Sequence, residues 1–287
     1  MEKRLNKIYS VAQKDMEKKV DSYFKRFEAK DEMKRKLVEV GELTEAKYKE
    51  WRKNQLLTGK HWKQMQKQIS EQMLAADKTA IAYINSQLPA VYAMNYNSLA
   101  EQINRIKGYS FELADAHTVK NLATTNKTLL PYKYVDEKKV IRWNTKRVNA
   151  QVMQGIIQGE SIPKIAKRLS ENVPGMEKES AIRNARTTVT SAENKGRMDS
   201  YHEAEEMGIV VKKVWVASID NRTRDAHREL NGQEEDVDTP FITTLALSKT
   251  NIIRDKIMYP GDPNANAANV YNCRCCLKSK IVSIKKR

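Results

Sequence analysis

The stretch WVASIDNRTRDAHRELNG, residues 215–232, has the most specific residue pattern in the chain. Around its start, residues 212–217 alternate β-branched and aromatic side chains with polar ones, which predicts a half-buried strand. Asp220 is of a residue type that favours turns and helix N-caps, so we expect a short helix over residues 222–230. Gly232 tolerates the left-handed conformation that ends many helices. The stretch therefore predicts a strand, a turn and a short helix in succession.

Two further motifs follow nearer the C-terminus. The motif YPGDP, residues 259–263, combines prolines of fixed φ, a glycine that accepts positive φ and an aspartate that can bond to backbone amides, which predicts a tight turn. The motif NCRCC, residues 272–276, contains all three cysteines of the chain. An odd number of crowded cysteines cannot form an extended disulfide framework, and this favours a protein made in a reducing cytoplasm.

Taken in this order, the motifs resemble those of the phage head-morphogenesis family, the MuF-type minor head proteins of tailed bacteriophages. The resemblance covers roughly residues 140–280. Upstream, Arg186 and its two neighbours are similar to the arginine-threonine element that opens the same domain. The other matching residues are Trp215, Asp220, Arg222, Thr223, Arg224, His227, Asn231, Gly232, Pro260, Gly261, Asp262, Pro263, Asn272, Cys273, Arg274 and Cys275.

This resemblance implies a role in the virion. It implies a minor head component that is packaged in few copies inside the phage head, is associated with the portal protein, touches double-stranded DNA without sequence preference, and assists head assembly and genome ejection. The scaffold and the major capsid protein are further candidate partners. During assembly, such a protein would reside in the host cytoplasm.

The composition agrees with a folded, basic protein. With 287 residues and a 40% hydrophobic share, the chain can form one large or two ordinary domains with buried cores. The formal net charge of +16 favours a polyanionic partner, and its spread along the chain favours salt-sensitive, non-specific binding to phosphates. An ordinary solvated surface of lysine-rich helices is the alternative. We expect no signal peptide and no membrane partner, because no apolar run of about 18 residues occurs.

Long amphipathic helices precede the motifs. Apolar residues recur every three or four positions over residues 3–38, which predicts one long helix. A second helix is expected from Thr44 and a third over residues 60–86. We expect Pro89 to separate this third helix from a fourth, because proline is common in the first turn of a helix.

The second half of the chain is expected to begin after a linker at residues 109–134, where the helical pattern weakens. A helix over residues 136–155 and another beginning near Ser161 follow. Pro174 and Gly175 predict a turn before a long helix over residues 177–207.

We therefore predict a mainly α protein with a small α+β C-terminal domain, in which long amphipathic helices are followed by a compact MuF-like unit. The predicted domains are a helical N-terminal region, residues 1–130, which would face portal, scaffold or DNA, and a MuF-like head-morphogenesis domain, residues 135–287. Residues 277–284 alternate well enough to form a closing strand of the second domain.

The histidine and the cysteines allow two chemical interpretations besides a structural one. Imidazole and thiolate are preferred zinc ligands, so His227, Cys273 and Cys275 could bind zinc, with Cys276 or Asp220 as the fourth ligand. Because C-x-C is tighter than the usual C-x-x-C spacing, we favour a hydrogen-bonded histidine beside packed thiols and no cofactor. A Cys-His hydrolase is less favoured, because neither a third catalytic member nor an oxyanion device is evident.

A third enzyme hypothesis is an effector similar to ADP-ribosyltransferases, in which Arg186 would bind nicotinamide dinucleotide and Glu229 would be the catalyst. It needs Arg186 on a strand, whereas the surrounding pattern predicts a helix. There, Arg186 has the spacing of apolar neighbours, so we expect it to pair with a carboxylate or carbonyl and to tie the helix to the C-terminal unit.

We predict no catalytic residue. The arginines near the motifs are expected to be structural and to pair with aspartates, because charge-assisted arginine-carboxylate bonds are strong enough to hold a small domain together. The expected arginines are Arg222, Arg224, Arg228 and Arg274, and the expected aspartates are Asp220, Asp225 and Asp262.

Overall fold

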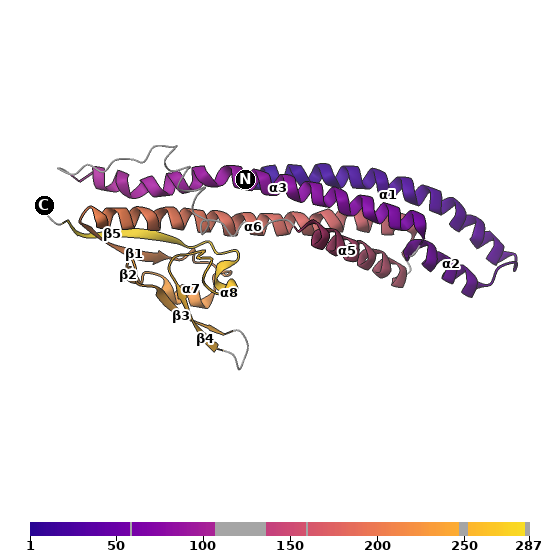
Figure 1. The fold of residues 1–287 in the computed structure, drawn as a ribbon. Helices are drawn as coiled ribbons and strands as arrows, with labels where there is room; N and C mark the ends of the chain where they lie inside the picture. The colour runs from indigo at the N-terminus through magenta and orange to yellow at the C-terminus, as the bar shows by residue number, and fades with distance from the viewer. Residues whose placement is uncertain (58, 107–135, 159, 247–251, 285–287) are drawn as a thin grey trace. The chain divides into compact units, whose positions relative to one another are not determined.

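The computed structural model, whose helices and strands are labelled in Figure 1, divides into two compact units. Unit 1 comprises Met1–Ala82 and Tyr134–Ile182, and unit 2 comprises Tyr83–Lys133 and Arg183–Arg287. Each unit draws residues from both halves of the chain, whereas each predicted domain is one continuous segment. The two units therefore do not test the predicted domains, which stay a prediction. The structure describes residues 1–57, 59–106, 136–158, 160–246 and 252–284, and the predicted linker at 109–134 lies outside them.

Helices predominate, as predicted from the sequence. They are α1 (Glu2–Glu39), α2 (Glu45–Leu57), α3 (Lys60–Asn104), α5 (Glu137–Ile157) and α6 (Ile162–Glu206). The buried side chains of α1 recur every three or four residues, which confirms the amphipathic stripe. Asp136 caps α5, because its carboxylate accepts a hydrogen bond from the Lys139 amide at 3.0 Å. No helix among the described residues combines the length and apolar character that a membrane span requires.

Two predicted helix boundaries are wrong. Helix α3 continues through Pro89, and α6 continues through Pro174 and Gly175. An interior proline removes one hydrogen bond of the helix, but it does not remove the packing of the apolar face. Around Pro89 this face is buried on both sides, at Leu88 and at Tyr92. Burial of that face therefore offsets the local loss, and the helix continues.

Unit 2 contains two small antiparallel sheets. Strand β1 (Ile209–Val216) is central in the first sheet, between β2 (Glu234–Asp236) and β5 (Cys276–Ile284). Trp215 pairs with Leu277, and the register shifts between Val210 and Val211. The predicted strands at 212–217 and 277–284 are therefore present, each beginning slightly earlier. The second sheet is the hairpin of β3 (Phe241–Ala246) and β4 (Ile252–Ile257).

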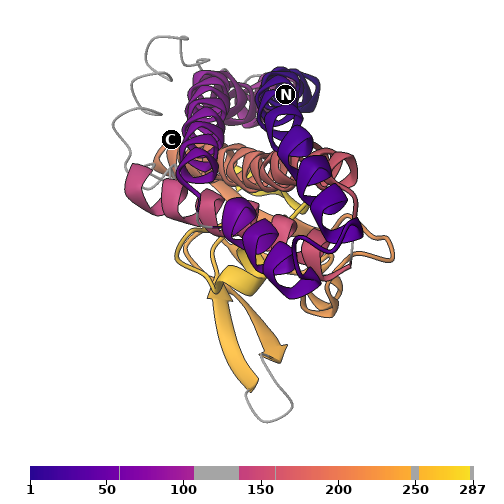
Figure 2. The same ribbon diagram turned by 90° about the vertical axis from the view of Figure 1, so that its right-hand side faces the viewer.

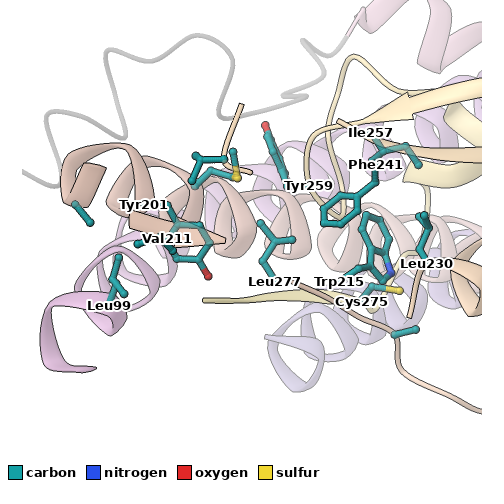
Figure 3. Close-up of a cluster of buried hydrophobic side chains, with 14 of the residues drawn as sticks. Leu99, Tyr201, Val211, Trp215, Leu230, Phe241, Ile257, Tyr259, Cys275 and Leu277 are labelled. Carbon is teal, nitrogen blue, oxygen red and sulfur yellow. The ribbon is translucent and has the colours of Figure 1, made fainter. Parts of the chain in front are cut away.

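The core of unit 2 joins the helices to both sheets. Side chains of α3 and α6, such as Leu99 and Tyr201, belong to one buried cluster with Trp215, Phe241 and Leu277 (Figure 3). Phe241 contacts Trp215 edge to face, with ring centroids 5.3 Å apart. Figure 2 shows the β3–β4 hairpin projecting from the rest of unit 2, so the hairpin is anchored at its Phe241 end.

Two short helices complete unit 2. They are α7 (Asp225–Leu230), between β1 and β2, and α8 (Ala267–Val270), before β5. Asn266 caps α8 by accepting a hydrogen bond from the Ala268 amide at 3.0 Å. Helix α7 lies within the 215–232 stretch, and α8 lies between the YPGDP and NCRCC motifs, so most motif residues lie in the connections between strands.

Candidate functional site

The NCRC segment is docked on helix α6 by buried polar side chains. The amide of Asn272 donates to Thr187 Oγ1 at 2.8 Å, and Thr190 Oγ1 donates to the carbonyl of Cys273 at 2.9 Å. Asn272 has a φ of 58°, which asparagine tolerates better than most residues. Fully buried Asn194 secures the start of β5, where its Oδ1 accepts from the Leu277 amide at 2.7 Å. The backbone around both cysteines is therefore fixed.

This docking brings three metal-ligand residue types together. Nδ1 of His227, on α7, lies 3.7 Å from Cys273 Sγ and 3.4 Å from Cys275 Sγ. Arg274, between the cysteines in sequence, is directed elsewhere, to Asp220. All three clustered side chains are buried, at 2%, 1% and 4% relative exposure, respectively. A large substrate has no access to these atoms as they stand.

The two thiols differ in electrostatics. A hydrogen bond from the Cys273 thiol lowers the pKa of Cys275, and the His227 side chain and the Ser218 amide lower it further. The hydrogen bond to Cys275, together with burial, raises the pKa of Cys273. The pair therefore favours one thiolate and one thiol. His227 Nε2 is buried without a hydrogen-bond partner among the described residues, and the Trp215 ring lies edge-on to the imidazole, 5.4 Å between centroids.

Asp220 stabilises the turn before α7 instead of capping the helix. Its carboxylate accepts two hydrogen bonds from Arg274, at 2.6 and 2.7 Å, and one from the Arg222 amide at 2.8 Å. The Arg274 guanidinium and the Arg222 amide hold the pKa of Asp220 well below its usual range. The helix begins only at Asp225, with Arg224 as an N-cap that lacks a side-chain hydrogen bond. The predicted start is therefore wrong, because the aspartate closes a turn with the amide two residues on.

The other arginines of this region bond mainly to backbone carbonyls. Arg228 donates to the carbonyls of Thr223 and Asp220 and lies 4.0 Å from the Asp225 carboxylate. Arg224 donates to the carbonyl of Tyr271. These contacts link the α7 region to the segment before Cys273, so the arginines contribute to holding the motifs together.

The Pro-Gly-Asp-Pro turn also packs against α6. Gly261 has a φ of 83°, and a Cβ there would lie 2.9 Å from the Ser191 amide nitrogen. The Asp262 carboxylate accepts from the amides of Met258, at 3.0 Å, and Asn264, at 2.9 Å. Asp262 thus orders the turn itself, and the hydrogen bonds described for its carboxylate come from backbone amides instead of the expected arginine. Pro260 is buried beside it.

The end of α7 is tied to the end of β1. Asn231 Oδ1 accepts from the Ala217 amide at 2.9 Å, and the Gly232 amide donates to the Trp215 carbonyl at 2.8 Å. Gly232 has a φ of 82°, as expected for a residue that ends a helix. Arg186, in contrast, is exposed on α6. The expectation that it lies on the buried side of its helix is wrong, because its neighbour Thr187 takes the buried position, where its Oγ1 accepts from the Asn272 amide.

Sequence analysis missed several structural residues of the site. Thr187, Thr190 and Asn194 share one face of α6 at intervals of three and four, but this spacing does not identify partners that lie about 80 residues later in the sequence. Lys213 is fully buried, and its Nζ donates to the carbonyls of Val237 at 2.9 Å and Met258 at 3.0 Å. Burial lowers the pKa of Lys213 to about 8. Its two-residue spacing from Trp215 in β1 was the signal for its burial.

Comparison with known families agrees with this arrangement. Residues 146–278 match the family described as Phage Mu protein F like protein, and they include α7 and the YPGDP and NCRC motifs. This part of the chain is a Phage Mu protein F-like domain. The family resemblance expected from the sequence is therefore confirmed.

Two curated relatives extend over different shares of the chain. The chain is 24% identical to Minor head protein GP7 of Bacillus phage SPP1 over 284 residues, which are 96% of this chain and 80% of that protein. It is 37% identical to NAD(+)–arginine ADP-ribosyltransferase EFV of Enterococcus faecalis over 110 residues, or 38% of this chain. The chain spans only 21% of that transferase. No solved structure matches the chain.

Proposed function

We propose that the chain is a minor head protein of a tailed bacteriophage, located inside the head in few copies. The observation that carries the proposal is the similarity to the SPP1 minor head protein along 96% of the chain. That similarity includes residues outside the Mu F-like domain, so it is not limited to the motifs. The similarity to the transferase covers only 38% of the chain.

The chemistry of the motif residues supports an architectural role. Asp220, Arg274 and Asp262 use their hydrogen bonds on one another or on backbone amides. His227 and the two clustered cysteines are nearly fully buried. A catalytic group needs access to its substrate, whereas a group that holds loops together does not.

Purified virions provide the test. We expect mass spectrometry to find the chain in intact heads, in far fewer copies than the major capsid protein, and protease added from outside to leave it intact until the heads are opened. An exposed tail protein, as a control, should be cleaved in both preparations. If the chain is missing from heads, or is cleaved in intact heads, the proposal is wrong.

Portal protein is the first partner that we propose, with the scaffold or major capsid protein next. When the full chain is co-expressed with portal protein, purification of the portal should also recover the chain. The same experiment with the major capsid protein tests that second partner. Co-purification with neither would refute these partners but would leave the location in the head to the virion experiment.

An ADP-ribosyltransferase activity is the second candidate, because of the 37% identity over 110 residues. Its predicted residues do not meet its own requirement, since Arg186 lies on α6 and not on a strand, and Glu229 lies on α7. We expect no transfer of labelled ADP-ribose from NAD(+) to an arginine-containing acceptor. Transfer by the intact chain that is lost in both Arg186→Ala and Glu229→Gln would establish the enzyme instead.

A further inference from the structure

We propose that His227, Cys273 and Cys275 bind one zinc ion in the Mu F-like domain. These residues form one of two groups among the described residues whose ligand atoms all lie within 4.8 Å of one another, and it is the buried one. The other group, around His202, is mostly exposed and acidic, and nothing further indicates a ligand there. The zinc proposal does not depend on the proposed role in the head.

The distances suit tetrahedral zinc. With Zn–S of about 2.3 Å and Zn–N of about 2.0 Å, the edges of a zinc tetrahedron are roughly 3.5 Å between nitrogen and sulfur. The observed separations of His227 Nδ1 from the two sulfurs are 3.4 and 3.7 Å. One ring nitrogen therefore faces both sulfurs at the spacing that a shared ion requires, and the ion needs little movement of the ligands.

The surroundings hold these ligands in place. The cysteine backbone is fixed by the hydrogen bond from Thr190 Oγ1 to the Cys273 carbonyl and by Asn194, whose amide group bonds to both ends of the Cys275–Leu277 segment. The amide of Cys275 also donates to Cys273 Sγ at 3.5 Å. Hydrogen bonds to metal-bound sulfur and to ligand backbones are the outer-shell contacts that orient ligands in metal sites.

The C-x-C spacing, which looks too tight in the sequence, is explained by the direction of the residue in between. Arg274 is directed to Asp220, so the two cysteines that flank it can both face His227. The same pairing removes Asp220 as a ligand, and Cys276 lies outside the group. The described residues thus offer three ligands, and a water molecule would supply the fourth.

Zinc would join parts of unit 2 that are distant in sequence. His227 belongs to α7, whereas Cys273 and Cys275 lie 46 and 48 residues later. The hydrogen bonds between His227 and these cysteines are the weak ones that sulfur makes. A metal bond would replace these and fasten α7 to the segment that leads into β5 (Figure 3 shows Cys275 at the Trp215 end of the core).

Cobalt substitution of the purified full chain tests the proposal. After removal of metal by a chelator under reducing conditions, we expect Co²⁺ to bind at one ion per chain with thiolate-to-cobalt charge-transfer absorption, and Zn²⁺ to displace it. Cys275→Ser and His227→Gln should reduce the affinity at least tenfold, whereas Cys276→Ser, the matched control, should keep it. Absence of thiolate absorption in the intact chain, or an unchanged affinity for Co²⁺ in Cys275→Ser and in His227→Gln, would overturn the proposal.

A second measurement uses the unmodified chain, so that it does not depend on whether a variant folds. With Zn²⁺ present, a thiol reagent followed by mass spectrometry should label Cys276 much faster than Cys273 and Cys275. Adding a chelator should raise the labelling rates of these two at least tenfold and leave that of Cys276 unchanged. Equal rates with and without Zn²⁺ would show that burial alone protects the thiols, and the zinc site would be refuted.

Discussion

At the scale of single residues, Asp220 shows how one carboxylate can organise a connection. It accepts from the Arg274 guanidinium and from the Arg222 amide, so it joins the turn before α7 to the segment before β5. An ionised carboxylate can accept several hydrogen bonds at once, whereas a protonated carboxyl has one O–H donor in place of part of this acceptor capacity and loses the charge that strengthens its bonds to arginine. The stability that Asp220 contributes therefore depends on its charge.

We predict that Asp220→Asn destabilises the chain at pH 7 and does so less and less at acidic pH. The pKa of Asp220 is depressed in the folded chain below its ordinary value of 3.8. Because the folded-state pKa is depressed, the carboxylate contributes its full stabilisation of the folded chain above pH 3.8. This stabilisation is lost as the pH falls through the folded-state pKa. Urea unfolding of both proteins at pH 7 and pH 3 measures this. A difference in the free energy of unfolding that is the same at both pH values would contradict the prediction.

Gly261 illustrates a second residue-scale effect, a steric one. We predict that Gly261→Ala lowers the free energy of unfolding by more than about 1 kcal/mol, since its φ is 83° and an added Cβ would meet the Ser191 backbone. Gly232→Ala is the matched control, because Gly232 has a φ of 82° but no atom within 4 Å of the added Cβ. Thermal unfolding should show the larger loss for Gly261→Ala; equal losses would mean that backbone conformation alone matters.

At the scale of elements, the long helices show what the sequence can and cannot predict. The amphipathic spacing predicts α1 and α2 closely, because burial follows a period of about 3.6 residues. Pro89 and Pro174 mislead, since the local preference of proline opposes a burial pattern that spans the whole helix. The docking face of α6 could not be predicted either, because the partners of Thr187 and Asn194 are about 80 residues distant in sequence.

The site shows the same division. The motif spacing predicts which residues matter, but not that Arg274 is directed away from Cys273 and Cys275, since that direction depends on Asp220 and on docking against α6. Local signals such as Gly232 at the end of α7 are predictable because the backbone conformation itself selects the residue type. A side-chain pairing between residues far apart in sequence, such as Arg274 with Asp220, leaves no such local signal, because it depends on how the two segments pack together.

Within unit 1, helices α1, α3, α5 and α6 meet at a buried acidic group. Tyr9 Oη donates to the Asp77 carboxylate at 2.7 Å. Burial is the main cause that raises the pKa of Asp77 from 3.8 to about 7, and the nearby Glu177 carboxylate contributes to the same rise. The Tyr9 hydrogen bond and the Arg147 guanidinium, which pairs with Glu177, act in the opposite direction. The packing of these helices should therefore respond to pH.

We predict that the intact chain loses stability relative to Asp77→Asn as the pH rises from about 4 to about 7. A raised pKa means that the folded chain retains a proton that the unfolded chain has released, so folding is favoured at the acidic end and the contribution is lost as pH rises through the folded pKa. The slope is at most about 1.4 kcal/mol per pH unit. Urea unfolding of the intact chain and of Asp77→Asn at several pH values measures this slope. A difference in the free energy of unfolding between the two proteins that stays constant with pH would contradict the prediction.

At the scale of the whole molecule, the formal net charge of +16 is the property that favours binding to DNA. Neutralising phosphates with lysine and arginine releases counterions, so the affinity for duplex DNA should fall steeply with salt. No sequence preference is needed for this attraction, because phosphate contacts are alike along any duplex.

We therefore predict that the full chain binds duplexes of unrelated sequence with equal affinity and that the logarithm of the association constant falls linearly with the logarithm of salt concentration. The slope, about −0.9 for each phosphate neutralised, should correspond to several phosphates. Fluorescence anisotropy over a salt series measures it. A flat response to salt would remove DNA from the partners, because only release of ions from the phosphate backbone ties this affinity to salt so strongly.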